Sequence, residues 1–548
     1  MLDLVDIPVA AMALAAAGLV PLVLAAVDDP DRDGRRAWAL RWARRLSWPG
    51  AAGVVASVAV APGALAVALV APYALTALLA ACHGAGRLAA RGLRPAGEVA
   101  IAAGLLYVAG AATWLVACRA GVALMGYPPY WVALTATHFH VAGVALPVVV
   151  GLHLRAGAGR LARAAAWTVV FGVPATAIGI AWSRTIEVGA AVALAGAALV
   201  IVWRAAGAAR RHRGAVGALH ALAAAALAVS MPLAAAYALR LDLRLGGLTA
   251  LDTMAVTHGA CNLLFAIASL AAFVLVPAPP RWRPGVPRSR LIASRRVGAD
   301  YFERLGVGSD RDVRGLVDDL DELAHPALVT SAVAPAIRAF YERTTDHVLR
   351  VTPRWRLGFR TGARVWAWWA RRLGQLELPR ADVGAQAVGC RLVALAASRD
   401  GRASPRGWVR CYPDGRPMYV AAYATHRAAG VGYMNIAFPL PGGQLASVMR
   451  MDPAAGAAGA AGAVVLTSHD DGTGDAGLYL ALRLGRRLRW LRLPMHETLA
   501  LWTAAMAEAP PALRAMATPA TTVLARHELT LLGVRYLTLD YVIGPAPR

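Results

Sequence analysis

The stretch GAAGVVASVAVAPGALAVALVAPYALTALLAAC, residues 50–82, decides how often this chain crosses a membrane. It is apolar and contains no charged residue. A spanning helix needs about 20 apolar residues, so the stretch is long for one span and short for two. Pro62-Gly63 interrupts it, and proline breaks or kinks a helix because it lacks a backbone donor. The stretch is therefore one kinked helix or two helices hinged at Pro62-Gly63.

The distribution of arginines favours two helices. Further apolar runs long enough to span a bilayer lie at 6–27, 97–118, 130–154, 163–183, 186–206, 215–239 and 251–276. With two central helices the total is about nine, and positively charged loops mark the cytoplasmic side. Most loop arginines then fall on one side, and the opposite side holds only Arg119, Arg184, Arg240 and Arg244. We therefore expect a polytopic α-helical membrane bundle of about nine helices, with the N-terminus outside and the C-terminal half in the cytoplasm.

The overall composition supports a membrane protein. Across 548 residues, 58% are hydrophobic, and the mean hydropathy of +0.51 exceeds that of ordinary soluble domains. The net charge is +24, all basic residues are arginine, and no face combines them with stacked aromatic residues as in single-strand binders. We therefore expect attraction to anionic lipid and no nucleic-acid partner. Five cysteines without CxxC spacing argue against a disulfide framework and a structural zinc site.

The chain changes character after residue 276. A Pro- and Arg-rich linker is expected at 277–297, a helical segment at 298–380 and an antiparallel β-rich domain at 381–548. Within 386–543, short alternating runs separated by turn residues predict a barrel or a sandwich. The second half is thus expected to be a cytoplasmic α+β domain ending in an antiparallel β barrel or sandwich.

The segment ARVWAWWARRLGQL, 363–376, has the pattern of an amphipathic helix with Trp366, Trp368, Trp369 and flanking arginines. Two interpretations are open. The helix lies on the membrane surface, or its tryptophans dock it onto the core of the domain.

Polar residues in the β-rich domain do not assemble into a catalytic set from the sequence. His496-Glu497 and His527-Glu528 are adjacent pairs on predicted strands, so each pair splits between opposite faces. His426, His469 and Asp475 lie in predicted turn regions. The acidic loop SHDDGTGDAG, 468–477, lacks the ligand pattern of an EF-hand, and a turn is favoured over a calcium site.

Histidines inside the membrane segments form the main candidate site, because polar residues there are costly and usually functional. His138 and His140 lie in TATHFHVAG, 135–143, and His258 lies in THGACN, 257–262. In the nine-helix topology all three are roughly 10–15 Å from the outer ends of their helices, at about 1.5 Å per residue. The expected substrate-binding residues around a shared polar site are His138, His140, His258, Asn262, Thr135 and Thr257.

Helix geometry limits a metal or haem site. Residues i and i+2 point about 200° apart around a helix, so His138 and His140 cannot hold one ion together. A single metal between His138 and His258 remains open. The motif HFHV resembles the paired histidines of haem–copper oxidase subunit I, but the further ligand histidines and the His-Tyr motif are absent. The other interpretations are interhelical hydrogen bonding and a substrate or proton site.

Several motifs together identify a family resemblance. They are LTATHFHVAGVALPVVVGL (134–152), MAVTHGACNLLFA (254–266), FYERTTDHVLRVTPRWRLGFR (340–360), DGRPMYVAAY (414–423), YMNIAFPLPGG (433–443) and GLYLALRLG (477–485). The chain resembles the YndJ-like bacterial membrane proteins from about residue 95 to its C-terminus. The resemblance implies a multi-pass protein of the bacterial cell (inner) membrane and assigns no chemistry.

Three functional hypotheses follow. The first is a transporter-like or small-molecule-binding membrane protein with its polar site around His138, His140 and His258. The second is a haem- or metal-dependent redox protein using the same histidines. The third is a lipid-binding membrane scaffold. The expected partners are the lipid bilayer and a small-molecule or lipid ligand; no cofactor is assigned.

Overall fold

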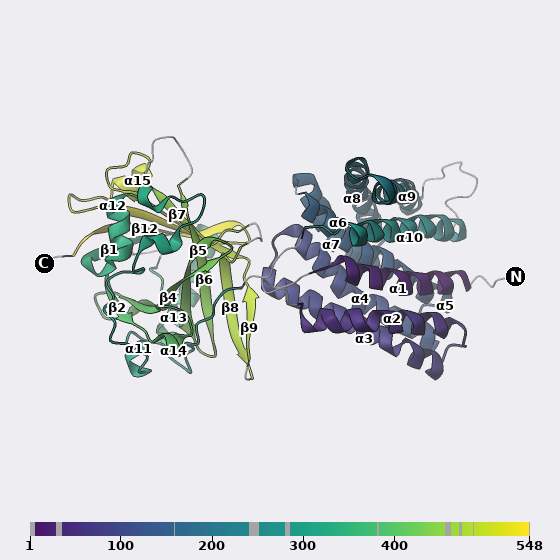
Figure 1. Ribbon diagram of the computed structural model, residues 1–548, viewed down its shortest axis with the longest axis horizontal. Coiled ribbons are helices and arrows are strands. Elements are labelled where there is room, and N and C mark those ends of the chain that lie inside the picture. Colours follow the sequence, from purple (N-terminus) through teal and green to yellow (C-terminus); the bar gives the residue numbers. More distant parts are fainter. Residues whose placement is uncertain are drawn as a thin grey trace. The chain divides into compact units, whose positions relative to one another are not determined.

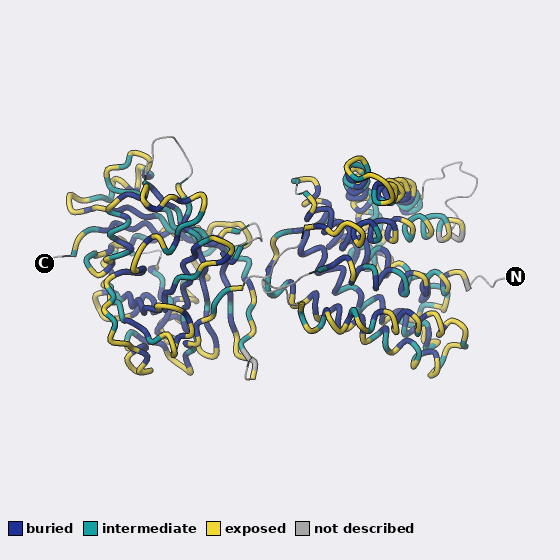
Figure 2. The backbone as a smooth tube through the Cα atoms, in the orientation of Figure 1, coloured by how far each residue is buried: buried dark blue, intermediate teal, exposed yellow. Residues whose placement is uncertain are grey.

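A computed structural model describes residues 6–28, 36–157, 159–240, 251–279, 285–380, 383–454, 462–470, 474–485 and 487–546. The chain divides into two compact units, Met1–Arg283 and Pro284–Arg548, called here the bundle and the barrel unit (Figure 1). Each has its own buried hydrophobic core, which is evident as the buried stretches of backbone in Figure 2.

The bundle is built from long antiparallel helices. Its elements are α1 (Asp6–Ala26), α2 (Trp38–Val58), α3 (Ala64–Arg91), α4 (Ala96–Ala120), α5 (Pro129–His138), η2 (Phe139–Ala145), α6 (Leu146–Ala156), α7 (Arg160–Trp182), α8 (Arg184–Arg211), α9 (Gly214–Ala238) and α10 (Leu251–Leu275). A short 3-10 turn, η1 (Leu124–Gly126), precedes α5. The elements α5, η2 and α6 follow one another without a break, so the described residues contain nine long helical rods, close to the number expected.

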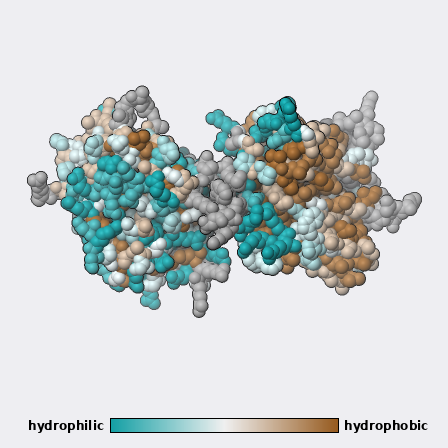
Figure 3. Space-filling model, in the orientation of Figure 1, coloured by the Kyte–Doolittle hydropathy of each residue, from teal (hydrophilic) through white to brown (hydrophobic). Residues whose placement is uncertain are grey.

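The central apolar stretch forms two helices, as the arginine distribution predicted. Helix α2 ends at Val58 and α3 begins at Ala64, with Pro62 and Gly63 between them. Within the described residues, eight helices are long and apolar enough to cross a membrane, and α2 is not among them. Arg41, Arg44 and Arg45 near its start explain the difference. Hydrophobic residues gather over the surface of the bundle and hydrophilic ones at one end of it (Figure 3).

Glycines allow the bundle helices to approach closely. A Cβ atom at Gly53 of α2 would lie 2.1 Å from the Leu69 carbonyl oxygen of α3. One at Gly151 of α6 would lie 2.4 Å from the carbonyl oxygen of Gly97 on α4. Small residues at such crossings bring backbones together where the hydrophobic effect supplies little force between helices.

The barrel unit is an antiparallel β-barrel, which resolves the alternative of barrel or sandwich. Its strands are β1 (His347–Trp355), β2 (Gln386–Ala394), β3 (Arg406–Cys411), β4 (Pro417–Ala428), β5 (Val431–Leu440), β6 (Gly443–Pro453), β7 (Val464–Thr467), β8 (Gly477–Leu484), β9 (Arg487–Arg492), β10 (Met495–Thr503), β11 (Val523–Leu531) and β12 (Val534–Pro545). The order β5-β4-β3-β2-β1-β12-β11-β10-β7-β6 closes through the pairing of β5 with β6, and β8 and β9 extend the sheet from β6.

Successive side chains point to the inside and the outside of the barrel, as the pleat requires, except where the register shifts between Arg410 and Cys411 and between Leu529 and Thr530. Leu349 and Val351 of β1, Trp408 of β3 and Tyr541 of β12 belong to the buried interior cluster. Helix α12 (Pro335–Glu342) adds Phe340 to the same cluster. The remaining short elements are α11 (Tyr301–Arg304), α13 (Arg360–Leu373), α14 (Ala397–Asp400), α15 (Pro511–Arg514) and the 3-10 turns η3 (Leu320–Leu323), η4 (Thr330–Ala332), η5 (Thr344–Asp346) and η6 (Leu357–Phe359).

The segment 298–380, expected to be helical, also contains a barrel strand. β1 pairs with β2 and β12. Its buried residues recur at every second position, Leu349, Val351 and Pro353, which is the period of a strand and not of a helix. The linker expected at 277–297 is partly packed: Leu291, Ala293 and Val297 are buried, and Ala293 forms a β-bridge to Pro441. Residues 280–284 of the linker lie outside the described residues.

Helix α13 does not dock through its tryptophans. Ala367 and Ala370 form its buried face, whereas Trp366, Trp368 and Trp369 are 38%, 49% and 51% exposed. The interpretation in which the tryptophans pack onto the core is therefore wrong, and the expected contact with a membrane surface stays a prediction.

Candidate functional site

The histidine motif of the bundle coincides with an irregular helix. The α-helix α5 ends at His138, and residues Phe139–Ala145 form the π-helical turn η2 before α6 resumes. A Cβ atom at Gly104 of α4 would lie 2.6 Å from the Val144 carbonyl oxygen, so η2 packs tightly on α4. π-Helical turns are rare and often occur at functional sites. The sequence predicts a regular helix here and gives no sign of this π-helical turn.

His140 points into the bundle core and is fully buried. Its Nδ1 lies 2.7 Å from the Ala136 carbonyl oxygen, and its Nε2 is hydrogen-bonded to the hydroxyl of Tyr73 on α3. With Nδ1 as the donor, Nε2 accepts the proton of Tyr73. Both ring nitrogens are therefore engaged, and the structure separates His140 from the other two histidines. Tyr73 was missed because a lone tyrosine in the 50–82 stretch gives no sign of its partner.

His138 lies on a different side of the rod and is exposed, as the i, i+2 spacing predicted. It has no hydrogen-bond partner within the described ranges, and it lies close enough to His258 for an electrostatic interaction. Helix α10 packs against both α1 and η2. His138 and His258 are thus the two predicted histidines that the fold brings together.

The ring of His258 is held in place by α9 and by its own helix. Its Nδ1 lies 3.0 Å from the Ser230 carbonyl oxygen and 3.2 Å from the Ser230 hydroxyl. The Asn262 amide nitrogen lies 3.0 Å from His258 Nε2 and 3.0 Å from the His258 carbonyl oxygen. Nδ1 therefore carries the proton and Nε2 accepts from Asn262. Ser230 was missed, since a serine in an apolar run carries no motif.

The predicted threonines contribute less. Thr257 donates to the Thr253 carbonyl oxygen at 2.8 Å within α10, and Thr135 is half-buried with no hydrogen bond to any described residue. Among the residues that the structure describes, no group of three or more His, Cys, Asp or Glu is placed to hold a metal. Zinc sites use at least three protein ligands, so the His138–His258 pair does not by itself fit one.

A buried ion network, also missed from the sequence, joins three helix ends. Glu98 of α4 accepts from Arg87 of α3 at 2.6 Å and from Arg155 of α6 at 2.7 and 3.0 Å. Arg91 Nε lies 3.5 Å from the same carboxylate. All four side chains are buried. The sequence signal that could have revealed this network was the acidic residue Glu98 at the start of the apolar run 97–118. At the rim, Arg184 pairs with Glu187 at 2.8 Å, as the spacing allowed.

In the barrel, Glu497 and His527 point inward and pair across strands. His527 Nε2 lies 2.8 Å from Glu497 Oε2, and Ser447 donates to the other carboxylate oxygen. Burial alone would raise the pKa of Glu497, but the hydrogen bonds from His527 and Ser447 outweigh it and lower the pKa. The carboxylate lies between the serine and the histidine, so His527 does not activate Ser447 as a nucleophile, which needs a serine–histidine contact.

The adjacent residues of both pairs face outward, as strand alternation predicted. Glu528 pairs with Arg535, and His496 stacks on His469 with ring centroids 4.1 Å apart. His426 lies on β4 and not in a turn as predicted, whereas Asp475 lies in a bend as expected; His426 Nε2 is 3.2 Å from Asp475 Oδ2. Residues 471–473 of the acidic loop 468–477 lie outside the described residues, so its calcium alternative stays untested.

Comparison with known proteins finds one matching family and one similar protein. Residues 10–265 match the family described as YndJ-like protein. The chain is 27% identical over 469 residues to "Uncharacterized membrane protein YndJ" of Bacillus subtilis (strain 168), an alignment that covers 81% of this chain and 78% of that protein. No solved structure matches.

Proposed function

Because this chain belongs to the YndJ-like family and is a multi-pass membrane protein, we propose that it binds a small polar molecule within the bundle, at His138, His258 and Asn262. This is a transporter-like or small-molecule-binding activity. The bilayer is the environment of the site.

One observation carries the proposal: His138, an exposed histidine without a hydrogen-bond partner among the described residues, lies beside an oriented one, His258. The Ser230 carbonyl fixes the tautomer of His258 and Asn262 donates to its Nε2, so the ring is held in one orientation beside His138. The π-turn that begins at Phe139 supports the proposal independently.

His140 is assigned a packing role in this proposal. Its bonds to Tyr73 and Ala136 leave neither ring nitrogen for a ligand. Interhelical hydrogen bonds of this kind are ordinary in membrane bundles.

The test uses the full chain in lipid nanodiscs and small molecules recovered from it by mass spectrometry. We expect a bound compound in the wild type that is lost from His138→Gln and from His258→Gln. His212→Gln, the same substitution at the α8–α9 connection, should retain it. Identical recovery from all four proteins would overturn the proposal.

Two measurements on the same samples address the alternative functions. A Soret band or one equivalent of metal that disappears in His138→Gln would replace the proposal with a redox protein. Stoichiometric lipid retained by all variants would replace it with a lipid-binding scaffold.

The proposal includes an orientation with nine spans, the N-terminus outside and the barrel unit in the cytoplasm of a bacterial cell (inner) membrane. It rests on the arginines of alternate loops and on α2 crossing despite its three arginines. Tags at residues 1 and 548 should be labelled from opposite sides of the membrane. Labelling from the same side would show that α2 does not span.

A further inference from the structure

The interior of the barrel contains a cavity of about 90 Å³. Its wall is mostly aromatic and aliphatic, with Trp408, Tyr419, Tyr423 and Tyr541 among the lining residues. Arg410 and His527 also line it. Ligand sites are commonly apolar cavities with a few placed polar groups. The cavity has this composition, and Arg410 is its distinctive member.

Arg410 is buried without a counter-charge from any residue that the structure describes. The residue is 3% exposed, and its Nη1 donates to the Tyr419 hydroxyl at 3.2 Å. Its Nε and Nη2 have no hydrogen-bond partner within the described ranges. The rings of Trp408, Tyr419 and Tyr541 lie 5.0, 5.1 and 5.0 Å from the guanidinium carbon, so cation–π contacts are its principal support.

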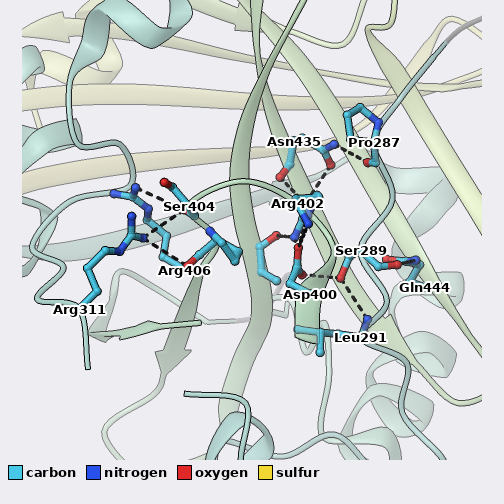
Figure 4. A network of polar contacts seen from close by, with 12 residues as sticks. Pro287, Ser289, Leu291, Arg311, Asp400, Arg402, Ser404, Arg406, Asn435 and Gln444 are labelled. Atoms are coloured by element: carbon cyan, nitrogen blue, oxygen red, sulfur yellow. Dashed lines mark hydrogen bonds and ion pairs between the residues drawn. The ribbon is translucent and has the colours of Figure 1, made fainter. Parts of the chain in front are cut away.

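A second buried arginine of the same unit shows what the Nε and Nη2 edge of a guanidinium ordinarily binds. Arg402 is 4% exposed, and its Nε and Nη2 hold the two oxygens of Asp400 at 2.7 and 3.0 Å. Its Nη1 donates to the carbonyl and side-chain oxygens of Asn435, as Figure 4 shows. Arg526 holds Asp540 through the same two nitrogens. This edge matches the two oxygens of a carboxylate.

The groups around Arg410 do not neutralise it. The Cys390 thiol and the Tyr541 hydroxyl lie beside the guanidinium. Burial raises the pKa of both groups, so they remain uncharged near neutral pH. The inward carboxylate of Glu497 is already engaged by His527 and Ser447.

We propose that the barrel binds a small organic acid, with its carboxylate on Nε and Nη2 of Arg410 and its apolar body among the aromatic side chains. The site is separate from the histidines of the bundle and does not depend on them. Two further buried donors line the cavity without a partner among the described residues, Trp408 Nε1 and the Tyr341 hydroxyl. They are placed to meet a second polar group of the ligand.

The cavity volume limits the size of the acid. An engineered apolar cavity of about 150 Å³ accepts benzene, and the barrel cavity is smaller. The ligand is therefore a short-chain acid, and a long-chain fatty acid does not fit. Met434 and Met449 in the wall adapt to the shape of the chain, since methionine is flexible and polarisable.

The test is saturation-transfer NMR on the full chain in nanodiscs, with butyrate, its neutral analogue butyramide, and decanoate as probes. A charge-assisted bidentate contact predicts at least about tenfold tighter binding of butyrate than of butyramide. Butyrate should also bind at least about tenfold more tightly than decanoate, which exceeds the cavity. Variants Arg410→Gln and Arg410→Met should lose the preference for butyrate.

Arg350→Gln is the matched control, because Arg350 is an arginine of barrel strand β1 whose side chain is exposed. It should bind butyrate as the wild type does. Equal affinity for butyrate and butyramide in the wild type, or unchanged butyrate affinity in a folded Arg410→Met protein, would overturn the proposal. If Arg410→Gln does not fold, Arg410→Met provides the comparison, since it fills the same space without charge. Tighter binding of decanoate than of butyrate would overturn the assigned ligand size.

Discussion

The bundle and the barrel treat buried charge in opposite ways. In the bundle, the carboxylate of Glu98 is held by Arg87 and Arg155 at the ends of three helices. In the barrel, Arg410 is equally buried but has no carboxylate partner in the described chain. A buried charge that is removed from water without a partner costs several kcal/mol. A group that bears this cost in the free protein is better explained by a ligand than by stability.

Polar groups that are exposed carry a weaker signal. His138 has no hydrogen-bond partner among the described residues, but its side chain is exposed, so a molecule outside the chain can reach it. The guanidinium of Arg410 is buried and is not reached in this way. The comparison therefore ranks the barrel cavity above the bundle histidines as a ligand site, and both remain open to direct test.

The largest expected effect is loss of the Glu98 network. Glu98→Gln removes the carboxylate between buried arginines, and breaking a buried ion pair costs about 3–5 kcal/mol. We expect a markedly lower midpoint of thermal unfolding of the full chain in detergent. If the midpoint is unchanged, the network does not hold the helix ends together.

The control for this prediction is the exposed pair at the rim. Glu187→Gln disrupts the Arg184 pair, and an exposed pair contributes about 0–1 kcal/mol. Its midpoint should stay close to that of the wild type.

A smaller effect is expected for Glu497 in the barrel. Glu497→Gln should cost about 1–3 kcal/mol, because His527 and Ser447 lose an ionised partner. Since the folded-state pKa of Glu497 is lowered, its stabilisation is complete above the pKa of an unfolded glutamate. It is lost as the pH falls through the folded-state pKa.

Hydrogen exchange of β10 and β11 between pH 7 and pH 4 measures this contribution. The wild type should lose protection on acidification more steeply than Glu497→Gln. Parallel pH profiles for the two proteins would show that the Glu497 carboxylate is not the titrating group.

His140 should affect stability and leave ligand binding unchanged. His140→Phe removes the contacts with Tyr73 and Ala136, which are worth about 0.5–1.5 kcal/mol in a membrane bundle. His138→Gln should leave the unfolding midpoint unchanged. The reverse pattern would place the ligand at His140 and contradict the packing role.

The smallest effect is expected at helix α13. Trp368→Ala removes an exposed ring, so the free energy of unfolding should change by less than about 0.5 kcal/mol. If the helix meets the membrane surface, an environment-sensitive fluorophore at position 365 should shift to the blue in anionic nanodiscs. A soluble peptide of α13 with the same fluorophore, in detergent-free buffer, gives the reference spectrum. An identical spectrum from the full chain in anionic nanodiscs would contradict this contact.

The fold was largely predictable from local patterns. The arginine distribution predicted the break at Pro62-Gly63, and strand alternation predicted the β-rich domain. β1 was misjudged because HVLRVTPRW contains polar and proline residues that obscure the alternation. The barrel closure between β5 and β6 depends on pairing register, which a single sequence does not specify.

The candidate sites were predictable only in part. Matching depth indicated that His138 and His258 could meet, and helix geometry separated His140 from them. The π-turn, Ser230 and Arg410 were missed. Each depends on tertiary neighbours: Arg410 is one arginine among many in the sequence, and only the barrel interior shows that its carboxylate-binding edge is unused.

The most direct test compares two of the buried arginines of the barrel unit through the variants Arg402→Met and Arg410→Met. Hydrogen exchange of β3–β5 is measured in the ligand-free full-length protein. Arg402→Met removes the counter-charge of the buried Asp400 carboxylate, which keeps its hydrogen bonds from the Ser289 hydroxyl and from the backbone N–H of residue 402, so protection should fall by about 3–5 kcal/mol. Arg410→Met replaces an unpaired charge with an apolar group of similar size, so protection should be equal to or greater than that of the wild type. A comparable loss in both variants would show that Arg410 serves stability and would contradict its assignment to a ligand.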